Sequence, residues 1–86
     1  MKGQKLPPEY SRQADKYLSA LDAKTERMLK DRIEKIPDGD IVPYKSRPGH
    51  YRLRVRSYRI IFIWQTPEQI LVSTITVRGQ AYKKGV

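Results

Sequence analysis

The spacing of the apolar residues changes partway along this chain of 86 residues, and the change limits the folds that the chain can adopt. In the first half, apolar residues recur every three or four positions, as they do on one face of a helix. From Tyr51 onward they recur at every second position, as they do on one face of a strand. Because the helices precede the strands, the pattern predicts an α+β fold with the helices packed on one face of a small sheet.

Two helices are expected in the first half. The first follows Ser11, a residue type that favours the N-cap position. Its apolar face consists of Ala14, Tyr17, Leu18 and Leu21. The second covers residues 23–36, with Asp22 as its candidate cap. Its apolar face consists of Leu29, Ile33 and Ile36, flanked by Met28. The short connection between the two predicts an antiparallel helical hairpin.

The strands are expected to form an antiparallel meander of three or four strands. Pro7 and Pro8 limit any strand before the helices to a short edge piece at residues 4–6 or 9–10. Residues 37–49 contain three prolines and two glycines and are predicted to be a loop. Strands are then expected over 51–55, 58–64 and about 70–77, joined by turns at Ser57 and at residues 66–69. We expect residues 1–86 to form a single domain.

Composition excludes several classes of protein. The chain has no cysteine and one histidine, so neither disulfides nor a zinc site are expected. It lacks the glycine-rich motifs that bind nucleotides. Its first ten residues have no apolar segment of the kind found in signal peptides, and its longest apolar run, residues 60–64, is far too short to span a bilayer. A cytoplasmic protein without membrane association is therefore expected.

The positive charge is concentrated in the second half of the chain. Residues 1–40 contain nine Lys or Arg and eight Asp or Glu, whereas residues 41–86 contain nine Lys or Arg and one Glu. Of the net charge of +9, residues 1–40 therefore carry +1 and residues 41–86 carry +8. Such a field attracts polyanions, and nucleic acid is the usual one. An acidic protein or an anionic membrane is the rival interpretation.

Arginine occupies alternate positions in the stretch HYRLRVRSYRIIF, residues 50–62. Arg52, Arg54 and Arg56 alternate with apolar residues, and Arg59 follows the expected turn. One side of the strand should therefore face the core while the other carries the arginines. Like charges on one sheet face repel unless an anion neutralises them, and guanidinium groups bind phosphate and stack on bases. A charged face that merely discourages strand pairing is the alternative.

Further candidates for RNA contacts flank the arginines. They are Lys45, Arg47, His50 and Arg56 on one side, and Gln80, Lys83 and Lys84 in the C-terminal tail. Tyr51 and Tyr58 are expected to be packing residues, whereas Tyr82, which lies in a polar segment, is the better candidate for stacking on a nucleotide.

The same segments resemble a known family. A helical hairpin followed by YRLRV (51–55), YRIIF (58–62) and RGQAY (78–82) resembles the RelE/ParE toxin superfamily of bacterial toxin–antitoxin systems. The resemblance covers nearly the whole chain and implies a RelE-like fold. It also implies that the chain is the toxin of a type II system with a cognate acidic antitoxin as its partner.

RelE-type members cut mRNA in the ribosomal A site, so the resemblance implies a ribosome-dependent endoribonuclease whose further partners are the ribosome and mRNA. By position, the catalytic residues would be Arg52, Arg54, Arg59, Arg78 and Tyr82, with Tyr82 orienting the cleaved nucleotide. ParE-type relatives share the fold, lack the nuclease residues and inhibit DNA gyrase. That activity stays open as an alternative, as does a non-enzymatic module that binds RNA or the ribosome.

Cleavage by the 2′-hydroxyl requires loss of a proton, stabilisation of a dianionic phosphorane and protonation of the leaving 5′-oxygen. Cationic side chains can stabilise the phosphorane, so no metal or other cofactor is expected. RelE-type enzymes often carry lysine where this chain has Arg52 and Arg54. Because arginine stays protonated in proteins, the general base would be His50, Tyr82 or a group of the ribosomal RNA. The alternative is an enzyme that relies on positioning and electrostatic stabilisation alone.

Overall fold

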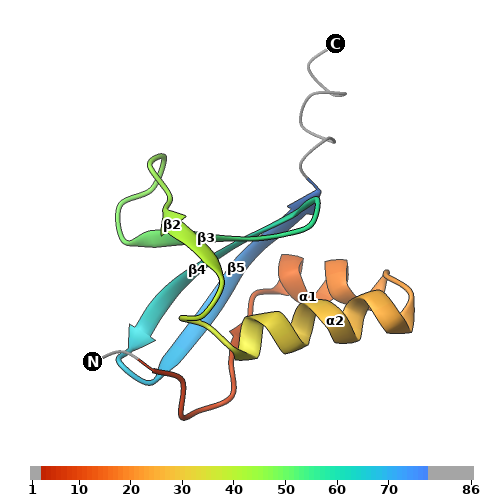
Figure 1. Ribbon diagram of the computed structural model, residues 1–86, viewed down its shortest axis with the longest axis horizontal. Helices are drawn as coiled ribbons and strands as arrows, with labels where there is room; N and C mark the ends of the chain where they lie inside the picture. The colour runs from red at the N-terminus through yellow and green to blue at the C-terminus, as the bar shows by residue number, and fades with distance from the viewer. Residues whose placement is uncertain (1–2, 78–86) are drawn as a thin grey trace.

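The structure is a computed structural model and describes residues 3–77 (Figure 1). In chain order the elements are β1 (Glu9–Tyr10), α1 (Arg12–Ser19), α2 (Ala23–Glu34), β2 (Asp40–Pro43), β3 (His50–Val55), β4 (Tyr58–Thr66) and β5 (Gln69–Val77). The strands form one sheet in the order β1-β5-β4-β3-β2. β1 is parallel to β5, and the other neighbours are antiparallel. Both helices lie on the same side of this sheet, which confirms the predicted α+β architecture (Figure 1).

Both helices begin where the capping residues predict. The hydroxyl of Ser11 accepts a hydrogen bond from the backbone N–H of Ala14 at 3.1 Å. The carboxylate of Asp22 accepts a hydrogen bond from the N–H of Thr25 at 3.0 Å. Hydrogen bonding to Thr25 lowers the pKa of Asp22 below its ordinary value. α2 ends two residues earlier than expected, at Glu34. Within residues 3–77 neither helix is long and apolar enough to cross a bilayer.

The core lies between the helices and one face of the sheet. The helices contribute Ala14, Leu18, Leu29 and Ile33, and the sheet contributes Leu53, Val55, Ile60, Phe62, Ile70, Val72 and Ile75. Each of these side chains is at most 4% exposed. The predicted apolar faces of both helices and of the 51–55 strand are therefore confirmed.

The prediction of an uninterrupted loop over residues 37–49 is wrong, because Asp40–Pro43 forms β2 at the edge of the sheet. Proline is tolerated there for a geometric reason. The N–H of Tyr44 donates to the carbonyl of His50, and hydrogen-bonded pairs alternate along an antiparallel ladder. Pro43, the preceding residue, therefore directs its nitrogen away from β3, where no N–H is needed. The turn-forming residues of this segment thus obscured a strand, and no other strand within residues 3–77 pairs with its outer edge.

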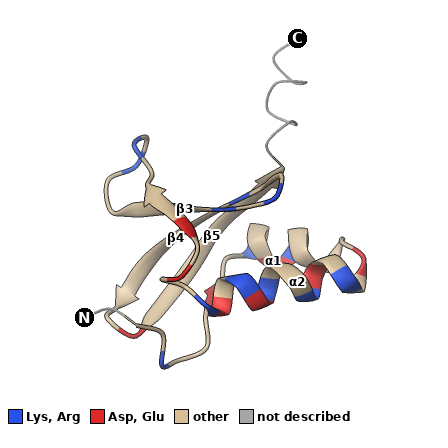
Figure 2. Cartoon of the chain, in the orientation of Figure 1, with Lys and Arg blue, Asp and Glu red and all other residues tan. Residues whose placement is uncertain are grey.

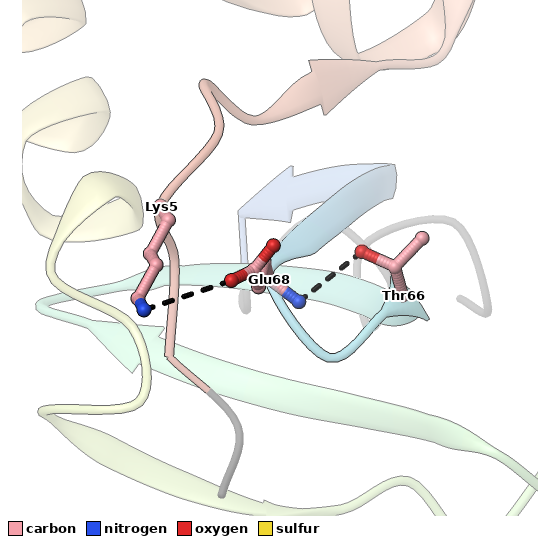
Figure 3. A network of polar contacts seen from close by, with 3 residues as sticks. All are labelled: Lys5, Thr66 and Glu68. Carbon is pink, nitrogen blue, oxygen red and sulfur yellow. Dashed lines mark hydrogen bonds and ion pairs between the residues drawn. The ribbon is translucent and has the colours of Figure 1, made fainter.

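The N-terminal segment ties the end of α2 to the turn between β4 and β5. The side-chain amide of Gln4 donates to the carbonyls of Ile33 and Ile36, at 2.7 and 3.0 Å. Ile33 lies in the last turn of α2, where its carbonyl also accepts the N–H of Ile36, and Ile36 lies just beyond the helix. The next residue, Lys5, donates its N–H to the carbonyl of Glu68 and places its ammonium 3.7 Å from the Glu68 carboxylate (Figure 3). The segment therefore acts as a strap between the two layers.

The free edge of β5 beyond β1 is covered by α1. The amide oxygen of Gln13 accepts from the N–H of Ile75 at 3.0 Å, and its amide nitrogen donates to the Ile75 carbonyl at 2.9 Å. One side chain thus replaces the pair of hydrogen bonds that a neighbouring strand would supply.

Replacing Gln13 with alanine is expected to lower the free energy of unfolding by about 1–2 kcal/mol, because both hydrogen bonds to Ile75 are lost. Urea denaturation measures this loss, and hydrogen exchange should show faster exchange of the Ile75 amide. Arg12→Ala, at an exposed neighbouring position on the same helix, is the control and should change neither quantity appreciably. If Gln13→Ala and Arg12→Ala have the same free energy of unfolding, water replaces the two hydrogen bonds to Ile75 without a loss of stability.

Candidate nucleic-acid interface

The face of the sheet that points away from the helices carries the predicted arginines. Residues directly opposite each other on neighbouring strands point to the same side, so the pairing register assigns each side chain to a face. We call the face away from the helices the open face. Its residues are Asp40, Val42, His50, Arg52, Arg54, Arg59, Ile61, Ile63, Leu71, Thr74 and Thr76.

Two guanidinium groups stand side by side on this face. Arg54 of β3 and Arg59 of β4 are Cα partners, and Arg52 lies one row away on β3. Arg54 is exposed, whereas Arg52 and Arg59 are half-buried. Like charges directly opposite each other destabilise a sheet. The arrangement therefore costs free energy in the isolated domain.

The carboxylates of the described residues do not neutralise these arginines. The ion pairs within residues 3–77 all involve lysines, namely Lys5–Glu68, Lys30–Glu26 and Lys35–Asp31. Asp40 is the Cα partner of Arg54 on β2, yet the two side chains do not form an ion pair. In Figure 2 acidic and basic residues are interspersed along α2, whereas basic residues predominate along the sheet.

Arg52 has an unsatisfied donor. Its Nε is buried and has no hydrogen-bond partner among the described residues. A buried donor without an acceptor costs about 1–3 kcal/mol, more when the group is charged. An anion bound by the terminal nitrogens of the same guanidinium would offset this cost.

His50 lies on the same face as the arginines, two residues before Arg52 and opposite Ile63. Its Nδ1 is 3.3 Å from the carbonyl oxygen of Pro48. Because a carbonyl can only accept, this contact requires the proton on Nδ1 and leaves Nε2 as an acceptor. Imidazole is the side chain best suited to exchange protons near neutral pH. The structure therefore brings the candidate base to the face that carries the candidate phosphate ligands.

Two tyrosines near the arginines are packing residues, as predicted. Tyr51 stacks on Phe62, with ring centroids 5.8 Å apart and planes at 28°. Tyr58 meets Tyr17 of α1 edge to face, at 6.4 Å and 85°. Both tyrosines pack against the core cluster, so they belong to the helix side of the sheet.

The remaining predicted residues are divided between two loops and the tail. Lys45 and Arg47 are exposed in the loop between β2 and β3, next to the His50 end of the open face. Arg56 lies in the expected turn between β3 and β4 with φ +55°, so it does not continue the alternation of Arg52 and Arg54 along β3. The other five, Arg78, Gln80, Tyr82, Lys83 and Lys84, lie outside the described residues and stay predictions.

Sequence reasoning did not identify the two threonines on this face. Thr76 is the Cα partner of Arg59, and Thr74 is the partner of Ile61. Their hydroxyl groups can both donate and accept hydrogen bonds. The sequence could have indicated them, because Thr74 and Thr76 alternate with the buried Ile75. Alternate residues of a strand point to opposite faces, so both threonines lie on the face away from the core.

Comparison with known proteins supports the same family as the motifs. The model of the family described as "ParE toxin of type II toxin-antitoxin system, parDE" matches residues 4–82. A similar fold occurs in the crystal structure of the RelB–RelE antitoxin–toxin complex from Methanococcus jannaschii, with a TM-score of 0.69 and 20% sequence identity over 88% of this chain and 96% of that one. No curated protein matches the sequence. The chain therefore belongs to the ParE toxin family of type II toxin–antitoxin systems, within the RelE/ParE toxin superfamily.

Proposed function

We propose that this toxin is a ribosome-dependent endoribonuclease that cleaves mRNA by attack of a ribose 2′-hydroxyl on the adjacent phosphate. The observation that carries the proposal is the pair of guanidinium groups at Arg54 and Arg59, opposite each other and free of ion pairs with the described carboxylates. A dianionic phosphorane between them would receive hydrogen bonds from both groups, which are in place before the reaction begins.

The other groups on the open face fit the remaining steps. Arg52 is half-buried, and the terminal nitrogens of its guanidinium can donate to a non-bridging phosphate oxygen. Nε2 of His50 can accept the proton of the 2′-hydroxyl, since Nδ1 donates to Pro48. The imidazolium of His50 then gives this proton to the 5′-oxygen as the P–O5′ bond breaks. The products are a 2′,3′-cyclic phosphate and a free 5′-hydroxyl, so atoms and charges balance.

The proposed regulator is an acidic antitoxin. The similar archaeal chain was crystallised as an antitoxin–toxin complex. On this chain, residues 41–86 carry a charge excess of +8, to which an acidic polypeptide is complementary.

A second candidate function is inhibition of DNA gyrase without cleavage of RNA. It is favoured by the family model, whose description names ParE. Like RNA, DNA presents phosphates that the open face can bind, so charge alone does not separate the two functions. The distinction depends on whether a bond in mRNA is broken.

Induced expression of the full chain tests the two functions in one experiment. The nuclease predicts new 5′ ends in primer extension on translated transcripts within minutes, and loss of these ends when the same transcripts lack a start codon. The gyrase inhibitor predicts intact transcripts together with an SOS response and loss of plasmid supercoiling. Intact transcripts in arrested cells would rule out the nuclease.

A further inference from the structure

Among residues 3–77, three positions have positive φ. Two of them are glycines, Gly39 (φ +122°) and Gly49 (φ +81°), which adopt this conformation without a side-chain clash. The third is Arg56, at φ +55° in the two-residue turn between Val55 and Tyr58. A side chain with a Cβ is disfavoured in this left-handed region. Arg56 therefore occupies a position that glycine would fill at lower cost.

No contact within the described fold accounts for arginine at this position. The side chain of Arg56 is exposed, and its guanidinium has no hydrogen-bond or ion-pair partner among residues 3–77. A strained residue that does not stabilise its own fold points to a role of its side chain with a ligand.

The position of the turn indicates which ligand. The turn joins the two strands that carry the opposed pair Arg54 and Arg59, and Arg56 lies two residues beyond Arg54. Two residues of extended chain span about 6.6–6.8 Å, which an arginine side chain and a phosphodiester can bridge. Arg56 therefore lies close enough to Arg54 for the two side chains to contact neighbouring phosphates of one strand.

We infer that Arg56 is a positioning residue that binds a phosphate of the RNA next to the one held by Arg54 and Arg59, and that its strained backbone is retained for this contact. The inference rests on the proposed function, because it requires a single-stranded RNA on the open face. The left-handed backbone lowers stability, whereas the side chain raises affinity for RNA. Substitution by glycine should therefore change stability and RNA binding in opposite directions.

The test uses the full chain and a short 2′-O-methyl RNA, which has no 2′-hydroxyl and cannot be cleaved. Its affinity is measured by fluorescence anisotropy over a range of salt concentrations. Arg56→Gly is expected to raise the melting temperature by about 2–8 °C, because glycine removes the strain. It should also lower the magnitude of the salt slope, d log K/d log[salt], by about 0.7, which is the value for the loss of one phosphate contact with a single strand. Arg56→Lys keeps the charge and should leave both quantities near those of the parent chain.

Two further variants separate the possible outcomes. Arg32→Ala removes one positive charge from α2, on the helix side, and should leave the salt slope unchanged. Arg59→Ala reports on the open face itself. If Arg59→Ala lowers the slope but Arg56→Gly does not, the proposed function survives and the role of Arg56 is refuted. If neither variant changes the slope, both are refuted. Equal effects of Arg32→Ala and Arg56→Gly, or a lower melting temperature in Arg56→Gly, would also overturn the inference.

Discussion

Arg59→Ala is expected to slow mRNA cleavage on programmed ribosomes by on the order of 10²-fold or more, the usual effect of removing one preorganised donor from a developing oxyanion. Arg59 is half-buried and lies opposite Arg54, so no other described residue of β4 can replace its guanidinium at that position. Single-turnover cleavage, followed by primer extension, measures the loss.

The stability of the same variant separates a catalytic loss from unfolding. Removing Arg59 also removes a like charge opposite Arg54, so the melting temperature should stay the same or rise. Arg59→Lys keeps the charge but not the bidentate geometry and should retain part of the activity. Full cleavage by a folded Arg59→Ala protein would mean that the opposed guanidinium groups are not the site of reaction.

Phe62→Ala is expected to have the largest effect on stability, a loss of about 3–5 kcal/mol in the free energy of unfolding. Phe62 is 1% exposed and lies in the central strand β4. Its ring centroid is 5.8 Å from that of Tyr51 and 6.4 Å from that of Trp64. The substitution leaves a cavity and removes both ring contacts. Since domains of this size are stable by about 5–15 kcal/mol, the variant should lose a large share of its stability.

Urea denaturation monitored by far-UV circular dichroism measures this change. Val42→Ala is the matched control, because Val42 is also a strand residue but is 37% exposed and should lose no more than about 0.5 kcal/mol. Phe62→Leu keeps most of the apolar volume, so its loss of unfolding free energy should lie between those of Phe62→Ala and Val42→Ala. Similar losses of unfolding free energy in Phe62→Ala and Val42→Ala would show that burial of the Phe62 ring contributes little to stability.

The parts of the fold predicted well from sequence depend on local chemistry. Ser11 and Asp22 predicted the helix starts because an N-cap needs only a side-chain oxygen close to the first free N–H groups. The alternation around Leu53 and Val55 predicted which face is buried, because strand geometry assigns alternate residues to opposite sides.

The features that were missed depend on residues distant in sequence. β2 was predicted to be loop because the prolines and glycines of residues 37–49 are turn signals, and only the register with β3 explains why Pro43 is tolerated. The parallel pairing of β1 with β5 brings together residues 62 positions apart, which no local pattern encodes.

The candidate site was predicted in part. Arg52, Arg54 and Arg59 share one face as expected, because strand periodicity and a short turn determine their side. Arg56 was expected to alternate with Arg52 and Arg54, but its left-handed backbone ends the alternation at a position where glycine is the usual signal. The unsatisfied Nε of Arg52 could not be foreseen, because burial of one atom depends on the packing of neighbouring strands.

The pairing of β1 with β5 also orders events during synthesis. The residues of β1 are synthesised before both helices and the other four strands, yet they lie beside Leu71 and Val72 of β5. Ser11 likewise donates to the carbonyl of Ser73, a bond that spans 62 positions. Before β5 is made, one edge of β4 has no partner strand and β1 has none, so the five-stranded sheet cannot form. The toxin therefore completes its sheet only after β5 has been synthesised.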